Sequence, residues 1–163
     1  MHKKALGVFE RIARRAHLFS DEVVKLGSVE HPFETKNIHP MLPALVRRMF
    51  DDSYYSQATF EACKYLDKEV ARISKISESG YKLMMKAFQE TSPLLALTPL
   101  GTDSEKDEQA GYKFIFSGAI MAIRNPRGHE YKINDSIDEC LDHLALISTL
   151  LRRLEKAGFS LQS

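Results

Sequence analysis

Every strongly patterned segment of this chain repeats its apolar residues at intervals of three and four, which is the period of an α-helix. No segment alternates apolar and polar residues as a strand on the face of a sheet does, and no internal repeat is visible. The pattern therefore predicts an all-α fold in which amphipathic helices bury their apolar faces against one another.

The periodic segments divide the chain into a series of expected helices. A basic amphipathic helix is expected over 3–17, and a connector over 18–39 has at most a short helical turn near 21–26. The later helices are expected over residues 40–51, 58–74, 81–88, 104–123 and 134–157, with a loop over 91–103. Ser104 is expected to cap the fourth of these, and the last is expected to begin at Asn134 or Asp135.

The domain organisation follows from length and from the place of the connector. A chain of 163 residues with 44% hydrophobic residues is long and apolar enough for one packed domain. We therefore divide it into an N-terminal basic helix with its connector (1–39), a helical domain (40–158) and a short tail (159–163).

Charge and targeting signals limit the classes of function. The net charge is only +1, so the chain lacks the positive excess of a protein that coats nucleic acid, and contact with RNA would be local. The N-terminus becomes charged before an apolar core of signal-peptide length develops, and no apolar run reaches membrane-spanning length. We expect a cytoplasmic protein with no membrane partner.

The two cysteines, Cys63 and Cys140, are expected to be buried reduced thiols. They lie far apart in the sequence and belong to no cysteine and histidine cluster with zinc spacing. A disulfide scaffold and a structural zinc site are therefore not expected.

The helix expected over 104–123 is apolar almost all round in its second half. Small residues at Gly111, Gly118, Ala119 and Ala122 would let neighbouring backbones approach closely. Such a helix is either the central helix of a bundle, or part of it faces another subunit.

The segment that follows this helix gathers chemically active side chains at an expected break in structure. It contains two cations, an amide, an imidazole and a phenol: Arg124, Asn125, Arg127, His129 and Tyr131. On an uninterrupted helix Arg124 and His129 would point about 140° apart, at roughly 100° per residue. Proline at position 126 disfavours helical geometry at the residue before it and lacks a backbone donor, so we expect a bend that brings Arg124 and His129 together.

The residues alone also allow an ordinary structural interpretation of this segment. Asn125 and Pro126 suit the cap and first turn of a helix, Arg124 could pair with an acid, and His129 could be an exposed loop residue. Spacing alone is not specific, because Arg11 and His17 also form an Arg-x5-His pair on an expected surface helix.

Residues 118–130, Gly-Ala-Ile-Met-Ala-Ile-Arg-Asn-Pro-Arg-Gly-His-Glu, resemble the signature of the Ymh-type family within the HEPN superfamily. The similarity covers about residues 37–156. It includes Asn37-Ile-His-Pro40, Tyr55 with Ala58 and Glu61-Ala62, Gly80-Tyr-Lys-Leu-Met-Met85 and Asp107-Glu-Gln-Ala-Gly111. The resemblance implies a HEPN-like bundle of four to five helices, commonly dimeric, with an Arg-x(4–6)-His pair in a cleft at the dimer interface.

Active members of that superfamily are metal-independent endoribonucleases of toxin–antitoxin and abortive-infection systems. The resemblance implies that Arg124, Asn125 and His129 are catalytic and that RNA, a second copy of the chain and an antitoxin protein are the partners, without a metal or cofactor. His129 would transfer a proton, Arg124 would stabilise the phosphate, and Arg127 would add positive potential for the RNA backbone. Tyr131 matches a tyrosine that is nucleotidylated in related toxins, and Gly128 departs from a common alanine, which could loosen His129.

Three alternatives to the ribonuclease remain from the sequence. The first is a non-catalytic HEPN module that dimerises or binds RNA or a nucleotide. The second is a metal hydrolase that uses His143 and Glu139, although a pair on a charged helix face is typical of solvated surface. The third is a Cys140 nucleophile, although an apolar helical position does not activate a thiol.

Overall fold

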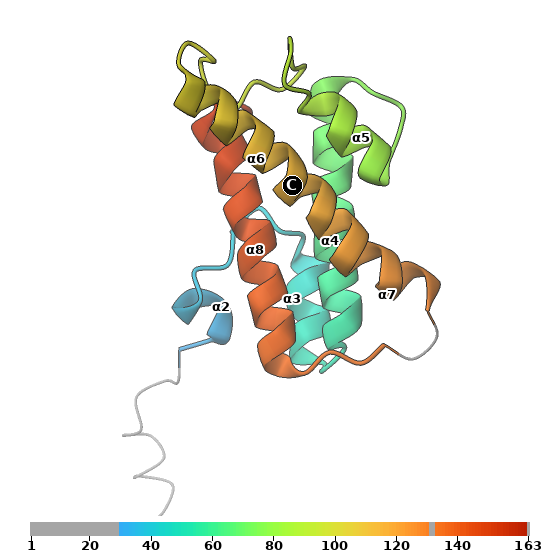
Figure 1. The fold of residues 1–163 in the computed structure, drawn as a ribbon. Coiled ribbons are helices and arrows are strands. Elements are labelled where there is room, and N and C mark those ends of the chain that lie inside the picture. Colours follow the sequence, from blue (N-terminus) through green and yellow to red (C-terminus); the bar gives the residue numbers. More distant parts are fainter. Residues whose placement is uncertain (1–29, 131–132, 163) are drawn as a thin grey trace, which may run out of the picture. The chain divides into compact units, whose positions relative to one another are not determined.

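The computed structural model describes residues 30–130 and 133–162, and every regular element within them is helical. In chain order the elements are α2 (Pro32–Thr35), α3 (Ala44–Asp51), α4 (Tyr55–Ser74), α5 (Gly80–Ala87), α6 (Asp103–Ala119), the π-helical turn η1 (Ile120–Arg124), α7 (Asn125–His129) and α8 (Ile137–Lys156) (Figure 1). The predicted all-α bundle is confirmed. None of the helices in the described residues is both long and apolar enough to cross a lipid bilayer.

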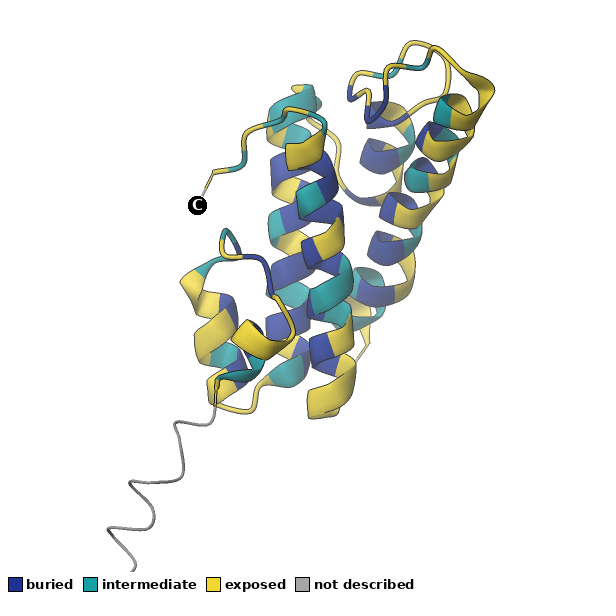
Figure 2. Ribbon diagram, turned by 90° about the vertical axis from the view of Figure 1, so that its left-hand side faces the viewer, coloured by how far each residue is buried: buried dark blue, intermediate teal, exposed yellow. Residues whose placement is uncertain are grey.

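The core of the bundle forms around α4, which packs against α3, α5, η1, α7 and α8. Buried residues line the inward faces of the long helices, and exposed residues cover their outer faces (Figure 2). The largest fully buried side chains come from α4, α5, α6, η1, α8 and the loop after α5: Leu66, Leu83, Met84, Phe88, Leu95, Phe116, Ile120, Leu144, Ile147, Leu150, Leu151 and Leu154. The Phe88 and Phe116 rings stack with centroids 4.3 Å apart, which joins the end of α5 to α6.

Two helices begin at residues that differ from the expected ones. Thr102, not Ser104, caps α6: its side chain accepts from the Glu105 backbone N–H at 3.2 Å, and Glu105 accepts from the Thr102 N–H at 3.0 Å. Ser136 and Glu139 form the same capping box at the start of α8, so that helix does not begin at Asn134 or Asp135. Reciprocal capping satisfies two backbone donors at once, which explains why these pairs determine where α6 and α8 begin.

The compact helical unit begins at Pro32, earlier than the expected boundary at Pro40. Phe33 in α2 is buried beside Phe50, with ring centroids 5.1 Å apart. The buried His39 side chain bonds to Glu155 at 2.9 Å. The basic helix expected over 3–17 lies outside the described residues.

The C-terminal segment also belongs to the helical unit. The Tyr65 hydroxyl donates to the Gln162 carbonyl at 2.8 Å, and the Gln162 backbone N–H donates to Glu69 at 2.9 Å. Arg72 in addition donates to the Ser160 carbonyl at 2.6 Å. These bonds tie residues 159–162 to α4, so they are part of the bundle and not a separate tail.

Candidate functional site

The helix is not interrupted at Pro126. Arg124 and Asn125 both have helical backbone angles, with φ −71° and ψ −48° for Arg124 and φ −64° and ψ −44° for Asn125. α6, η1 and α7 follow one another without an intervening loop, and α7 ends only at His129 (Figure 1). The predicted break in the helix is therefore wrong.

The π-helical turn η1 explains how the helix accommodates the proline. The Asn125 backbone N–H donates to the Ile120 carbonyl, five residues back, and such a bond widens the turn just before Pro126. The Arg127 Nη1 donates a hydrogen bond to the Ile123 carbonyl at 2.7 Å. The wider turn makes room for the proline ring, so the helix continues.

A continuous helix sets which motif side chains can meet within one chain. Arg124 and His129 leave the helix about 140° apart, whereas Asn125 and His129 are four residues apart and share one face. The Arg124 side chain nevertheless reaches that face, because its Nη1 donates to Asn125 Oδ1 at 3.2 Å. His129 is exposed, and no described residue hydrogen-bonds its imidazole.

The Arg124 guanidinium is only partly buried, yet one of its donors lacks a partner. Its Nε is buried without a hydrogen bond, and its Cζ lies 6.0 Å from the centroid of the Phe60 ring. Gly80, at φ +69°, lies close by, and its backbone N–H donates to the buried Asp67 at 2.7 Å. An unpartnered buried donor carries a free-energy cost.

Gly128 allows α7 to lie directly on the Phe60 ring. A Cβ atom at Gly128 would stand 3.1 Å from Phe60 Cε2, closer than ordinary van der Waals contact. The glycine therefore brings the segment that carries His129 against α4.

Arg127 is held by a bidentate ion pair. Its Nε and Nη2 lie 2.9 Å and 2.5 Å from the two oxygens of Asp135, and its Nη2 lies 3.3 Å from His143 Nδ1. Only 9% of the Arg127 side chain and 3% of the Asp135 side chain are exposed. The structure thus shows Arg127 joining α7 to the segment before α8, and its contact with the RNA backbone stays a prediction.

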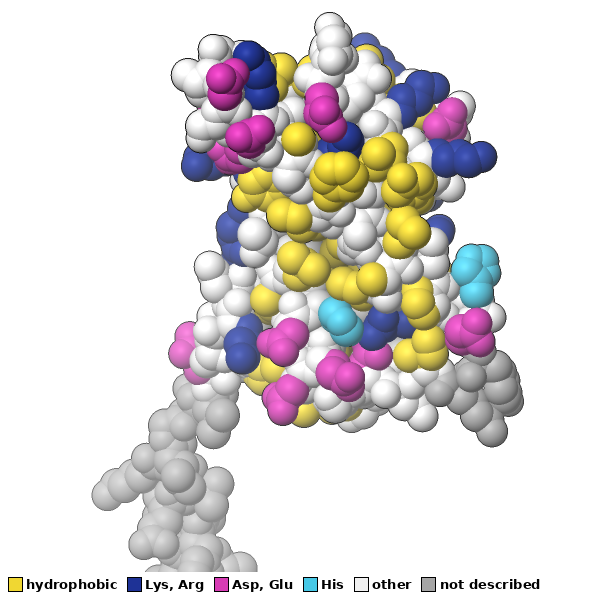
Figure 3. Space-filling view, viewed as in Figure 1, with side chains coloured by type: hydrophobic (Ala, Val, Ile, Leu, Met, Phe, Trp, Pro, Cys, Tyr) yellow, Lys and Arg dark blue, Asp and Glu magenta, His cyan; other side chains and the backbone are white. Residues whose placement is uncertain are grey.

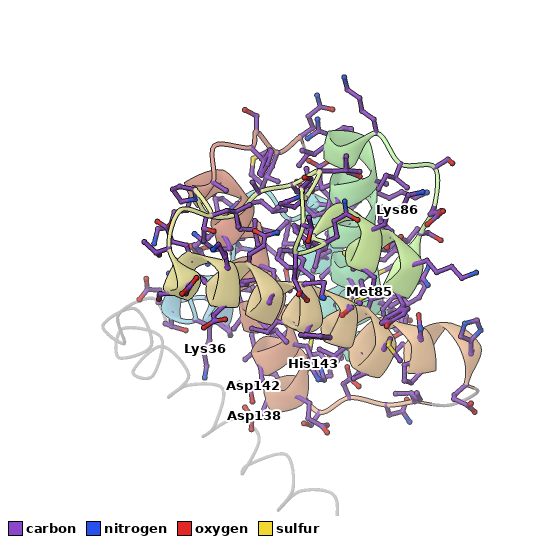
Figure 4. All side chains as sticks on the ribbon, turned by 45° about the horizontal axis from the view of Figure 1, so that its top comes forward. Lys36, Met85, Lys86, Asp138, Asp142 and His143 are labelled. Carbon is purple, nitrogen blue, oxygen red and sulfur yellow. The ribbon has the colours of Figure 1, made fainter. Side chains whose placement is uncertain are left out.

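The ionisable groups around this ion pair have shifted pKa values. Burial opposes ionisation of Asp135, but the hydrogen bonds and charge of Arg127 outweigh it and lower the Asp135 pKa. Burial and the Arg127 charge lower the pKa of His143, which lies on α8 near Asp142 (Figure 4). A neutral His143 fits the contact, because arginine can only donate to its ring nitrogen.

The alternative nucleophile and metal sites find little support in the geometry. Burial raises the pKa of the Cys140 thiol, and it raises that of Cys63 to about 12, so both are held in the unreactive neutral form. Glu139 is engaged with Ser136 at the start of α8. Over residues 30–130 and 133–162, no group of three His, Cys, Asp or Glu side chains is arranged to hold a metal ion.

A cavity of about 190 Å³ opens beside α7, between that helix and α4. Its wall combines the Phe60 ring and Ile133 with polar groups from Ser56, Gln57, Arg127, Glu130 and Asn134. Tyr131, the expected modification site, lies outside the described residues.

A comparison of the sequence with models of known families places the chain in one of them. The model of a family described as Protein of unknown function (Hypoth_ymh) matches residues 36–154. The chain belongs to the Hypoth_ymh family. The match includes all helices from α3 to α7 and nearly all of α8, and with them the whole motif from Arg124 to His129. No curated protein and no solved structure matches the chain.

One face of the Hypoth_ymh bundle leaves large apolar side chains in solvent. Phe114, Ile115 and Met121 are 58%, 45% and 51% exposed. Figure 3 shows hydrophobic side chains gathered along the face that α6 occupies in the same view. At positions i, i+4, i+7 and i+11, Phe114, Gly118, Met121 and Asn125 follow one stripe, so the apolar face leads directly to the motif.

Sequence reasoning missed two residues that shape the site. From the sequence, Asp135 is expected at the start of a helix. The Ser136-x-x-Glu139 pattern is a capping-box signature, however, and it places Asp135 before α8. Phe60 carries no local signal, because its contacts with Arg124 and Gly128 join segments far apart in the sequence.

Proposed function

We propose that this Hypoth_ymh protein is a metal-independent endoribonuclease in which two copies of Arg124, Asn125 and His129 form the active site. The observation that carries the proposal is the Arg124 guanidinium, whose Nη1 bonds Asn125 while its buried Nε has no partner. The same motif carries an exposed imidazole, His129, and π-helical turns such as η1 are frequent at functional sites. The resemblance of the motif to the HEPN superfamily supports the same activity.

RNA supplies its own nucleophile for this reaction. The 2′-hydroxyl attacks the adjacent phosphorus, the P–O2′ bond forms, and the P–O5′ bond breaks. One imidazole accepts the proton of the 2′-hydroxyl, and a protonated imidazole donates to the leaving O5′, which gives a 2′,3′-cyclic phosphate and a 5′-hydroxyl. Arg124 stabilises the negative charge that develops on the phosphate oxygens.

A second copy of the chain completes this chemistry. One protomer offers a single His129, and one imidazole cannot be base and acid in the same step, so base and acid cannot both come from one motif. The exposed Phe114 and Met121 form an apolar stripe that ends at Asn125. Pairing this stripe across a two-fold axis buries it and brings the two motifs together.

The physiological role that we propose is that of a toxin or defence ribonuclease. RNA is its substrate, and a neutralising antitoxin protein is its regulatory partner. Tyr131 would be the residue that such a partner modifies. These roles rest on the HEPN resemblance, and growth arrest on expression of the chain is the expected phenotype.

The test compares RNA cleavage by the full chain and its variants in the presence of EDTA. We expect His129→Ala and Arg124→Ala each to lower the rate by on the order of 100-fold or more. Arg48→Ala, which removes an exposed arginine of α3, is the matched control and keeps the activity. Products that end in 2′,3′-cyclic phosphate support the proposal, and wild-type binding of RNA without any product would favour a non-catalytic RNA-binding module.

A further inference from the structure

The cavity beside α7 has the composition of a base-binding site. A volume of 190 Å³ is smaller than the roughly 300–1,000 Å³ typical of drug-sized ligand sites. It suits one planar ring system better than a whole nucleotide cofactor. One wall is aromatic and the rest is largely polar, as a nucleobase requires.

Phe60 supplies a stacking surface in this cavity. The ring is only partly buried, and it is held by Gly128 at one edge. The Arg124 Cζ stands 6.0 Å from its centroid, close enough for a phosphate at Arg124 and a base at Phe60 to belong to one stretch of RNA. Unstacked bases of single-stranded RNA bind on aromatic side chains in this way.

Three polar side chains in the cavity wall remain free to read the edge of a base. Ser56 and Arg127 already bond to Asp135. Gln57, Glu130 and Asn134 are exposed and make no side-chain hydrogen bond to a described residue. Gln57 lies one turn before Phe60 on α4, so the two face the cavity together.

Glu130 gives the cavity a preference among the bases. An ionised carboxylate only accepts hydrogen bonds, and its two oxygens can take two adjacent donors. Guanine is the base with two adjacent donors, N1–H and N2–H, on its Watson–Crick edge. The two amides can then donate to, or accept from, the remaining edge atoms.

We propose that this cavity binds a guanine base of the RNA next to the cleaved phosphate. Phe60 stacks on the base, Glu130 accepts its N1–H and N2–H donors, and Gln57 and Asn134 complete the contacts. The inference rests on the proposed ribonuclease function and adds sequence preference to it.

The experiment measures affinity for non-cleavable RNA. The probes are short 2′-O-methyl oligouridines with one central guanosine, adenosine, cytidine or uridine, and the full wild-type chain binds each at the same salt concentration. We expect the guanosine probe to bind at least about fivefold more tightly than the other three, since one bidentate contact to a base edge contributes discrimination on that order. Glu130→Gln should bring the four affinities within about twofold of one another.

Two further variants separate charge and stacking from the specific contact. Asp107→Asn removes a carboxylate near the start of α6, about 30 Å from the motif at roughly 1.5 Å per residue, and should keep the guanosine preference. Phe60→Leu keeps apolar volume but loses the stacking surface, and should weaken binding of all four probes by about 5- to 150-fold. A thermal melt verifies that each variant is folded.

The outcomes distinguish this inference from the function on which it rests. Equal wild-type affinity for the four probes, or a guanosine preference that survives Glu130→Gln, overturns the guanine site. If Arg124→Gln weakens binding although the guanine site has been overturned, the chain binds RNA through Arg124 but has no base pocket. Failure of the wild-type chain to bind any probe overturns both proposals.

Discussion

Arg124 Nη1 donates to Asn125 Oδ1 across 3.2 Å, and this contact carries the guanidinium to the helix face that Asn125 shares with His129. The backbone alone would separate the two ionisable groups by about 140°. In the proposed active site, this bond gives Asn125 the role of positioning Arg124.

The positioning role of Asn125 predicts the effect of its removal. Asn125→Ala leaves Arg124 without its polar anchor, and a shift of about 1 Å in a catalytic group lowers a rate by on the order of 100-fold. RNA cleavage should fall by about that factor while the unfolding midpoint stays near that of wild type. A variant with full activity would show that the Arg124 contact is incidental.

The buried pair of Arg127 and Asp135 predicts a large effect on stability. Asp135→Ala leaves the Arg127 charge buried and unpaired, which should cost about 3–5 kcal/mol in the free energy of unfolding. The double variant Arg127→Met with Asp135→Leu should recover most of that loss. Urea denaturation measures both, and a loss below about 1 kcal/mol for Asp135→Ala would contradict a buried, essential pair.

The environment of His143 predicts a pH dependence of stability. Burial and Arg127 lower its folded-state pKa, against the opposing effect of Asp135, Glu139 and Asp142. The unfolded chain therefore takes up the proton first, so stability is full above an unfolded pKa of about 6.5 and falls as the pH drops toward the folded value. The unfolding midpoint should fall more steeply below that pH in wild type than in His143→Gln, and identical profiles would contradict the shift.

The apolar stripe on α6 and η1 predicts how the chain associates. Met121→Glu places a charge among Phe114 and Ile115, and burial of that charge would oppose pairing of the two stripes. Sedimentation should show a dimer for wild type and a monomer for the variant, with cleavage lost in the monomer. Lys64→Glu, an exposed change on α4, is the control and should remain dimeric. A dimeric Met121→Glu would place the interface elsewhere.

The sequence predicts the bundle because each of its long helices has a local apolar period, whereas the short α2 and α7 are not expected. The apolar periods of α4, α6 and α8 need no knowledge of their neighbours, and the bundle follows from burying them. The starts of α6 and α8 also have a local signal, since Thr102 with Glu105 and Ser136 with Glu139 are capping-box pairs.

The geometry of the site was less predictable for a physical reason. The rule that proline bends a helix is local, whereas the π-helical turn that accommodates Pro126 is stabilised by contacts of η1 with α4 and α5. The partners of Arg124 and Arg127 come from α4 and from the segment before α8, and no spacing rule relates them.

Two copies of the motif act in one active site of the proposed ribonuclease, and mixed dimers test this most directly. Wild-type chains are unfolded together with His129→Ala chains, refolded at equal amounts to randomise the dimers, and assayed for RNA cleavage with EDTA. If each site needs both imidazoles, only dimers of two wild-type chains act, and cleavage per total protein is about one quarter of that of wild type alone. A value of about one half would show that each protomer cleaves independently, and would contradict the shared site.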